Sequence, residues 1–187
     1  MGIMNLGYVI LEMQDPAKWS KFAQDILGFG EAESFGEIGT KYLRMDNAPF
    51  RYMVRKGNKD RFLAGGYEIS SKSDFENQIE LFEGSGIDVY RGTKAESDCR
   101  AVEAFVSVKD PSGNTVEIFY GRAPDKSFLP GHGIRKFITG AMGLGHMVLP
   151  APENETTISF YEDLMGFGVS DDLTLPAFAP EMPEQRI

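Results

Sequence analysis

The sequence predicts an α+β protein made of paired βαβββ modules, with one complete domain followed by the start of a second. Three observations support this prediction. The stretch 6–30 recurs without gaps as 144–168, and a repeat of this kind indicates duplicated structural units. A weaker copy opens near Leu63. The first two copies both read as a strand, a helix and then further strands.

The first copy opens with a short apolar run at residues 6–11, which is typical of a buried strand. Asp15 and Pro16 predict a helix start, because aspartate caps helices and proline suits the first turn. We expect this helix over residues 17–27, with Gly28 as its C-terminal stop. Two strand-like runs follow, at residues 41–45 and 50–54.

The second copy repeats this order with different residues. Residues 66–69 echo residues 7–10, so that Tyr67 takes the place of Tyr8. Ser73 and Glu76 have the spacing of a capping box and predict a helix that runs to about Glu83.

A β-hairpin is predicted to close the second copy. Asp110-Pro111-Ser112-Gly113 has proline second and glycine fourth, as tight turns prefer. The strand-like runs 102–109 and 114–120 lie on either side of it.

A domain boundary is expected within residues 121–140, which are rich in glycine and proline. We predict one complete two-module domain over residues 1–135. Residues 136–187 would then be the opening of a second, incomplete domain, because a βαβββ unit needs more residues than follow Gly168.

Composition narrows the class of protein. A net charge of −9 without a basic stripe argues against nucleic-acid binding. No apolar run reaches the ~20 residues of a membrane span, so no membrane partner is expected. The single cysteine, Cys99, fits a reducing cytoplasm. No helix start is predicted before it, which disfavours a catalytic thiol.

The most informative difference between the copies is that Tyr8 in the first is His146 in the third. If residues 145–148 form a strand, His146 and Val148 lie on the same face of it. By itself, a lone histidine on a strand is most often a hydrogen-bonded core residue.

Paired modules with Leu-Gly-His on a first strand resemble the vicinal oxygen chelate superfamily. More narrowly, the sequence resembles the type I extradiol ring-cleavage dioxygenases, such as the 2,3-dihydroxybiphenyl dioxygenases. The resemblance covers nearly all of residues 1–168. Its matching stretches agree in order and spacing, and they are residues 5–8, 110–114, 117–121 and 143–149.

The resemblance implies that the domain 1–135 carries no metal and that the domain opening at residue 136 holds iron(II). In such enzymes two histidines and one glutamate bind the iron and leave positions open for a catechol and dioxygen. His146 matches the first of these histidines, and Val148 would line the catechol pocket. The remaining ligands and the proton-handling residues are expected beyond Ile187, so no catalytic residue is assigned. The implied partners are a small aromatic diol, dioxygen and further copies of the chain in a homo-oligomer.

Three other candidates have simpler explanations. His132 stands between two glycines and is expected to be a solvated loop residue. Glu117 is expected to be structural and hydrogen-bonded inside the sheet, because Tyr8 and Tyr67 stand where iron would need imidazoles. Adjacent carboxylates such as Asp171 and Asp172 are usually solvated.

Two alternatives remain open on the sequence. A degenerate module of the same superfamily could hold a small ligand or form oligomer contacts without catalysis. A glyoxalase-type metalloenzyme is the other alternative. Metal analysis separates the three, since iron(II) favours the dioxygenase, zinc or nickel the glyoxalase, and no metal the binding module.

Overall fold

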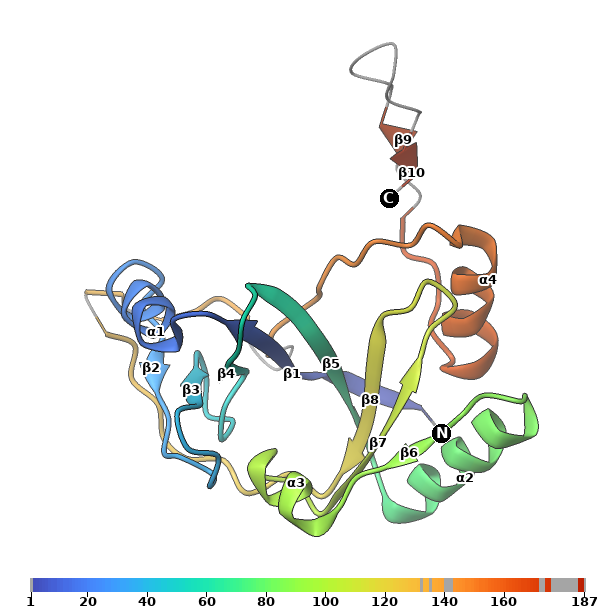
Figure 1. Cartoon of the computed structure of the whole chain (residues 1–187), viewed down its shortest axis with the longest axis horizontal. Helices are drawn as coiled ribbons and strands as arrows, with labels where there is room; N and C mark the ends of the chain where they lie inside the picture. Colours follow the sequence, from blue (N-terminus) through green and yellow to red (C-terminus); the bar gives the residue numbers. More distant parts are fainter. Residues whose placement is uncertain are drawn as a thin grey trace.

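The computed structural model describes residues 2–131, 133–134, 136–139, 143–171, 174–175 and 185–186, and its centre is one eight-stranded sheet (Figure 1). The first module contributes β1 (Ile3–Met13), α1 (Pro16–Asp25), β2 (Gly30–Glu31), β3 (Lys41–Arg44) and β4 (Tyr52–Lys56). The second contributes β5 (Arg61–Ile69), α2 (Lys72–Gly84), β6 (Tyr90–Arg91), α3 (Lys94–Cys99), β7 (Ala104–Lys109) and β8 (Thr115–Tyr120). After these come α4 (Asn154–Ser159), the π-helical turn η2 (Phe160–Leu164), β9 (Thr174–Leu175) and β10 (Gln185–Arg186).

The strand order β2-β3-β4-β1-β5-β8-β7-β6 confirms the duplication. In each module the first strand pairs in parallel with the last, β1 with β4 and β5 with β8. The two modules join where β1 pairs antiparallel with β5. The sheet therefore contains the βαβββ unit twice, and the β1–β5 pairing forms a central seam between the two copies.

Local signals set most element boundaries. The Asp15 side chain accepts a hydrogen bond from the backbone N–H of Lys18, and Gly28 ends the α1 region at a φ of +74°. The Asp110 turn closes the β7–β8 hairpin, with the Gly113 N–H donating to the Asp110 carbonyl at 2.9 Å. The capping box predicted at Ser73 is wrong, because α2 begins two residues earlier with Ser71 as its cap.

The helical face of the sheet carries the larger part of the core. From α2, Phe75, Ile79 and Phe82 pack on buried strand residues of the second module. The third copy adds Phe160, whose ring stacks on Phe82 at 5.9 Å, and buried Met165. Figure 1 accordingly shows α4 beside α2, at the opposite end of the sheet from α1.

The third copy does not start with a strand. Residues 145–150 have no regular secondary structure, so the strand predicted at residues 145–148 is wrong. A strand needs a hydrogen-bonded neighbour, and none of the described strands pairs with this segment. Its burial nevertheless alternates, with His146 and Val148 exposed while Met147 and Leu149 are partly buried.

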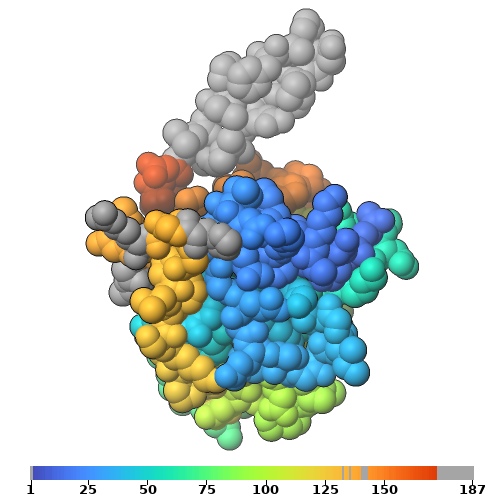
Figure 2. All heavy atoms as spheres, turned by 90° about the vertical axis from the view of Figure 1, so that its left-hand side faces the viewer, coloured from blue at the N-terminus to red at the C-terminus, as the bar shows by residue number. Residues whose placement is uncertain are grey.

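The segment after β8 runs along the first module, as Figure 2 shows from the side of α1. The Lys126 N–H donates to the Asn47 carbonyl at 2.8 Å, and Phe137 packs on Phe29. Within the described part of the chain, no helix is long and apolar enough to cross a membrane.

Candidate functional site

The seam between the modules places three backbone positions side by side in the middle of the sheet. Tyr8 on β1 lies opposite Gly66 on β5, and Gly66 lies opposite Glu117 on β8. Gly66 is needed here because a Cβ atom would come within 2.2 Å of the Tyr8 ring. The Tyr8 ring therefore lies against Gly66, where a side chain would otherwise stand, and its hydroxyl reaches Glu117.

Glu117 is buried and makes hydrogen bonds through both carboxylate oxygens. Tyr8 Oη donates to Oε2 at 2.7 Å. Arg100 donates to the same oxygen from Nε at 2.7 Å and to Oε1 from Nη2 at 2.6 Å. The side chains of Arg100 and Glu117 are only 10% and 4% exposed. The expectation that Glu117 is hydrogen-bonded inside the sheet is thus confirmed.

Arg100 is the residue that the sequence reasoning missed. It follows α3, a helix that was not expected, although Thr93 and Glu96 form a capping box there with the usual spacing. Its guanidinium also lies 3.9 Å from the centroid of the Phe105 ring. Helix α3 thus places the Arg100 guanidinium on the inner face of the sheet, next to Glu117.

The ionisation of this cluster follows from its burial. Burial raises the pKa of the Tyr8 hydroxyl well above 10.0, and the negative charge of Glu117 raises it further. Burial opposes the charge on Arg100, but the hydrogen bonds and charge of Glu117 outweigh this and raise the guanidinium pKa. Tyr8 is therefore a neutral donor, and Arg100 is the cation that balances the carboxylate.

Tyr67 does not join Tyr8 and Glu117, which corrects the expected pairing of two tyrosines. Successive side chains on a strand point to opposite faces, so Gly66 faces Tyr8 and Tyr67 faces the helices. The Tyr67 ring packs edge-on against Phe167 of the third copy, at 5.4 Å. Burial raises its pKa to about 12, with a further contribution from Asp110.

The predicted site residues of the third copy lie at the surface. His146 is exposed, and Val148 is 74% exposed. The described residues contain no group of three or more His, Cys, Asp or Glu side chains that could hold a metal. They therefore do not by themselves fit an iron site, and His146 is a single imidazole facing outward.

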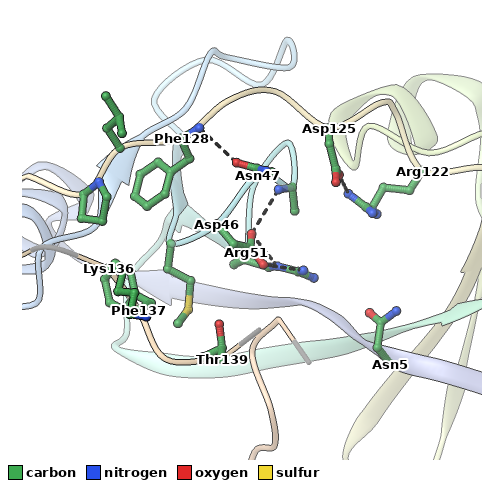
Figure 3. Close-up of a pocket in the computed structure, with 14 residues that line it drawn as sticks. Asn5, Asp46, Asn47, Arg51, Arg122, Asp125, Phe128, Lys136, Phe137 and Thr139 are labelled. Atoms are coloured by element: carbon green, nitrogen blue, oxygen red, sulfur yellow. Dashed lines mark hydrogen bonds and ion pairs between the residues drawn. The ribbon is translucent and has the colours of Figure 1, made fainter. Parts of the chain in front are cut away.

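A polar cavity of about 410 Å³ lies between β1, the β3–β4 connection and the segment after β8 (Figure 3). Arg51 binds Asp46 with Nη2 to Oδ2 at 2.7 Å, and Arg122 binds Asp125 with Nη1 to Oδ1 at 2.6 Å. Asn5 contributes a buried Oδ1 with no partner among the described residues. Both arginines are thus paired with carboxylates, and Lys136 is a further cation among the lining residues.

Of the other candidates, Cys99 and Asp171 lie among the described residues. Cys99 ends α3, so the expectation of no preceding helix start is wrong, but the C-terminal end of a helix does not favour a thiolate. Burial also raises the pKa of the Cys99 thiol. His132 and Asp172 lie outside the described residues, and Asp171 is exposed.

Comparison with known proteins identifies relatives over nearly the whole chain. Residues 6–57 match the family model described as dihydroxybiphenyl dioxygenase BphC D1. An iron-dependent extradiol dioxygenase of Rhodococcus jostii (strain RHA1) is 32% identical over 94% of this chain. A biphenyl-2,3-diol 1,2-dioxygenase of Paraburkholderia xenovorans (strain LB400) is 32% identical over 95%.

The fold agrees with the sequence relatives. The crystal structure of a catechol 2,3-dioxygenase superimposes on all of this chain with a TM-score of 0.88 and 28% identity. The chain spans 58% and 62% of the two sequence relatives and 65% of that crystal structure. The paired-module fold predicted from the sequence is thereby confirmed.

Replacing Arg100 should destabilise the protein strongly, because Arg100→Met leaves the Glu117 carboxylate buried without a counter-charge. We expect a loss of about 3–5 kcal/mol in the free energy of unfolding, measured by urea denaturation. Arg91→Met, which removes exposed ion pairs, is the matched control and should cost far less.

Adding Glu117→Gln to Arg100→Met should recover part of the loss, because the double variant buries no unpaired charge. An Arg100→Met protein as stable as wild type would contradict this account of the cluster.

The raised pKa of Tyr8 predicts a loss of stability in alkali. The pKa of Tyr8 is higher in the folded protein than in the unfolded chain, where it is 10.0. Its neutral hydroxyl therefore stabilises the folded state in full only below pH 10.0. This contribution declines as the pH rises from 10.0 toward the folded value. Tyr8→Phe should therefore lose less unfolding free energy than wild type between about pH 9 and about pH 11. Equal losses in urea titrations of the two proteins would show that Tyr8 ionises freely.

Proposed function

Because this chain belongs to the extradiol ring-cleavage dioxygenase family, we propose that it serves in cleaving a catechol-type aromatic ring with dioxygen and iron(II). The proposed substrate is a small aromatic diol such as a dihydroxybiphenyl, by analogy with the relatives' names. The glyoxalase-type alternative is disfavoured, since the relatives reported above are named as dioxygenases.

The position of Tyr8 carries the proposal for His146. Tyr8, the equivalent of His146 in the repeat, reaches a glutamate two strands away at the centre of the sheet. A histidine at the same place in a complete copy would face the matching inner position, where a carboxylate from the closing strand could join it. We therefore propose His146 as an iron ligand, with Val148, on the same exposed side, lining the diol pocket.

We further propose that the domain 1–135 takes no metal and that residues from 136 onward begin the metal-bearing domain. The salt bridge of Glu117 with Arg100 supports the first part, because both carboxylate oxygens already accept hydrogen bonds from a cation. Homo-oligomer formation and a cytoplasmic location also remain proposals. Iron(II) with open coordination positions would supply the oxygen chemistry.

The proposal can be tested with three proteins given iron(II) and 2,3-dihydroxybiphenyl. They are this chain alone, this chain continued by the unmatched C-terminal part of the Rhodococcus jostii relative, and the latter with His146→Ala. The first should bind no stoichiometric iron and form no yellow ring-fission product, since it offers one of three ligands. The second should do both, and the third should lose iron.

Three results would contradict it. The first is iron binding and turnover by the intact chain alone, verified by mass. The second is a folded extended protein that binds no iron or prefers zinc or nickel. The third is an unchanged iron content in the His146→Ala variant. Circular dichroism of all three proteins establishes that they are folded.

A further inference from the structure

The turn between β7 and β8 does more than close a hairpin, because its side chains reach into the third copy. Asn114 Nδ2 donates to the Pro150 carbonyl at 2.9 Å. Ser112 Oγ accepts from the Glu153 N–H at 3.1 Å and lies 2.8 Å from the Thr157 hydroxyl. Figure 1 shows this turn beside α4.

The turn is held together by hydrogen bonds to one buried carboxylate. Asp110, which is 3% exposed, accepts the Asn114 N–H at 2.7 Å through Oδ1. Its Oδ2 accepts the Asn114 side-chain amide at 2.9 Å and the Tyr161 hydroxyl at 3.2 Å. The same carboxylate therefore fixes the turn and holds the helical part of the third copy.

Two further contacts hold the chain close to His146, one made by Met147 directly after it and one made by Gly143 before it. Met147 fills a notch at Gly65, where a Cβ atom would come within 2.1 Å of Met147 Cε. Gly143 packs on the guanidinium of Arg51, which is fixed by Asp46 and by the Gly7 carbonyl at 2.8 Å. The backbone is thus held before and after His146.

These anchors explain the alternating burial of the segment. Met147 and Leu149 turn inward and line a cavity of about 330 Å³ together with Tyr67 and Asp110. His146 therefore turns outward although no strand pairing holds it there.

We propose that Ser112 and Asn114 are positioning residues that fix the backbone beside His146 from the neighbouring domain. The metal-free domain then orients the first metal ligand of the next one. The ligand role of His146 rests on the proposed function, whereas the anchoring does not.

The test measures a distance distribution in the whole chain by double electron–electron resonance, without metal. In a Cys99→Ala background, spin labels are attached at Val148→Cys, beside His146, and at Glu80→Cys, on the exposed side of α2. The unmodified turn should give one narrow distribution. Ser112→Ala with Asn114→Ala should at least double its width. Amide hydrogen exchange at Glu153 should become about tenfold faster, since its N–H loses the Ser112 Oγ acceptor.

Lys109→Ala is the matched control, because Lys109 Nζ donates only to Gly113 O and Thr115 Oγ1 of its own hairpin among the contacts described. It should leave the distribution narrow. Ser112→Ala alone, which loses only bonds to the third copy, gives an intermediate width and guards against misfolding of the double variant. The proposal is overturned if the unmodified turn gives a broad distribution, if the double variant stays narrow, or if Lys109→Ala broadens it equally.

Since no iron is present, failure here leaves the proposed ligand role of His146 untouched. Equally, a narrow distribution would persist if the extended protein bound no iron.

Discussion

The antiparallel pairing of β1 with β5 is the constraint on which the rest of the structure depends. It joins two βαβββ modules into one sheet and aligns Tyr8 with Gly66, and through β8 with Glu117. The neighbouring pair, Val9 with Gly65, leaves a notch on the other face of the sheet. One seam therefore sets both the inner polar cluster and the place where Met147 docks.

Gly66 and Gly65 have different roles on the two faces of the β1–β5 seam. At Gly66 the missing side chain makes room for the Tyr8 ring, so that Glu117 is satisfied by a tyrosine and an arginine. The charge of a buried carboxylate must be balanced, and Arg100 does this within the chain. At Gly65 the missing side chain admits a residue of the third copy. The first two modules thereby combine an inner cluster whose charges are balanced within the chain with an outer notch that holds Met147, next to His146.

The repeat, the turn residues and the caps were enough to predict the paired modules, because these signals are local or self-similar. Side-chain partners across strands were harder to foresee. Tyr67 was paired with Tyr8 by sequence echo, but bulges in β1 set a register that puts Gly66 there instead. Arg100 escaped notice because its partner lies 17 residues away, although Thr93 and Glu96 marked the helix that carries it. The prediction of a strand around His146 was wrong because the alternation of residues along the segment says nothing about whether a neighbouring strand is available to pair with it.

The central claim is that the first two modules hold the segment of His146 in place. The most direct measurement is an NMR nuclear Overhauser effect between the Met147 methyl group and the Gly65 α-protons, with Met147→Leu used to assign the methyl signal. The contact of Met147 with Gly65 predicts a strong cross-peak and a methyl shift displaced from that of free methionine. A Met147 methyl without that cross-peak, at the free methionine position, would contradict the account.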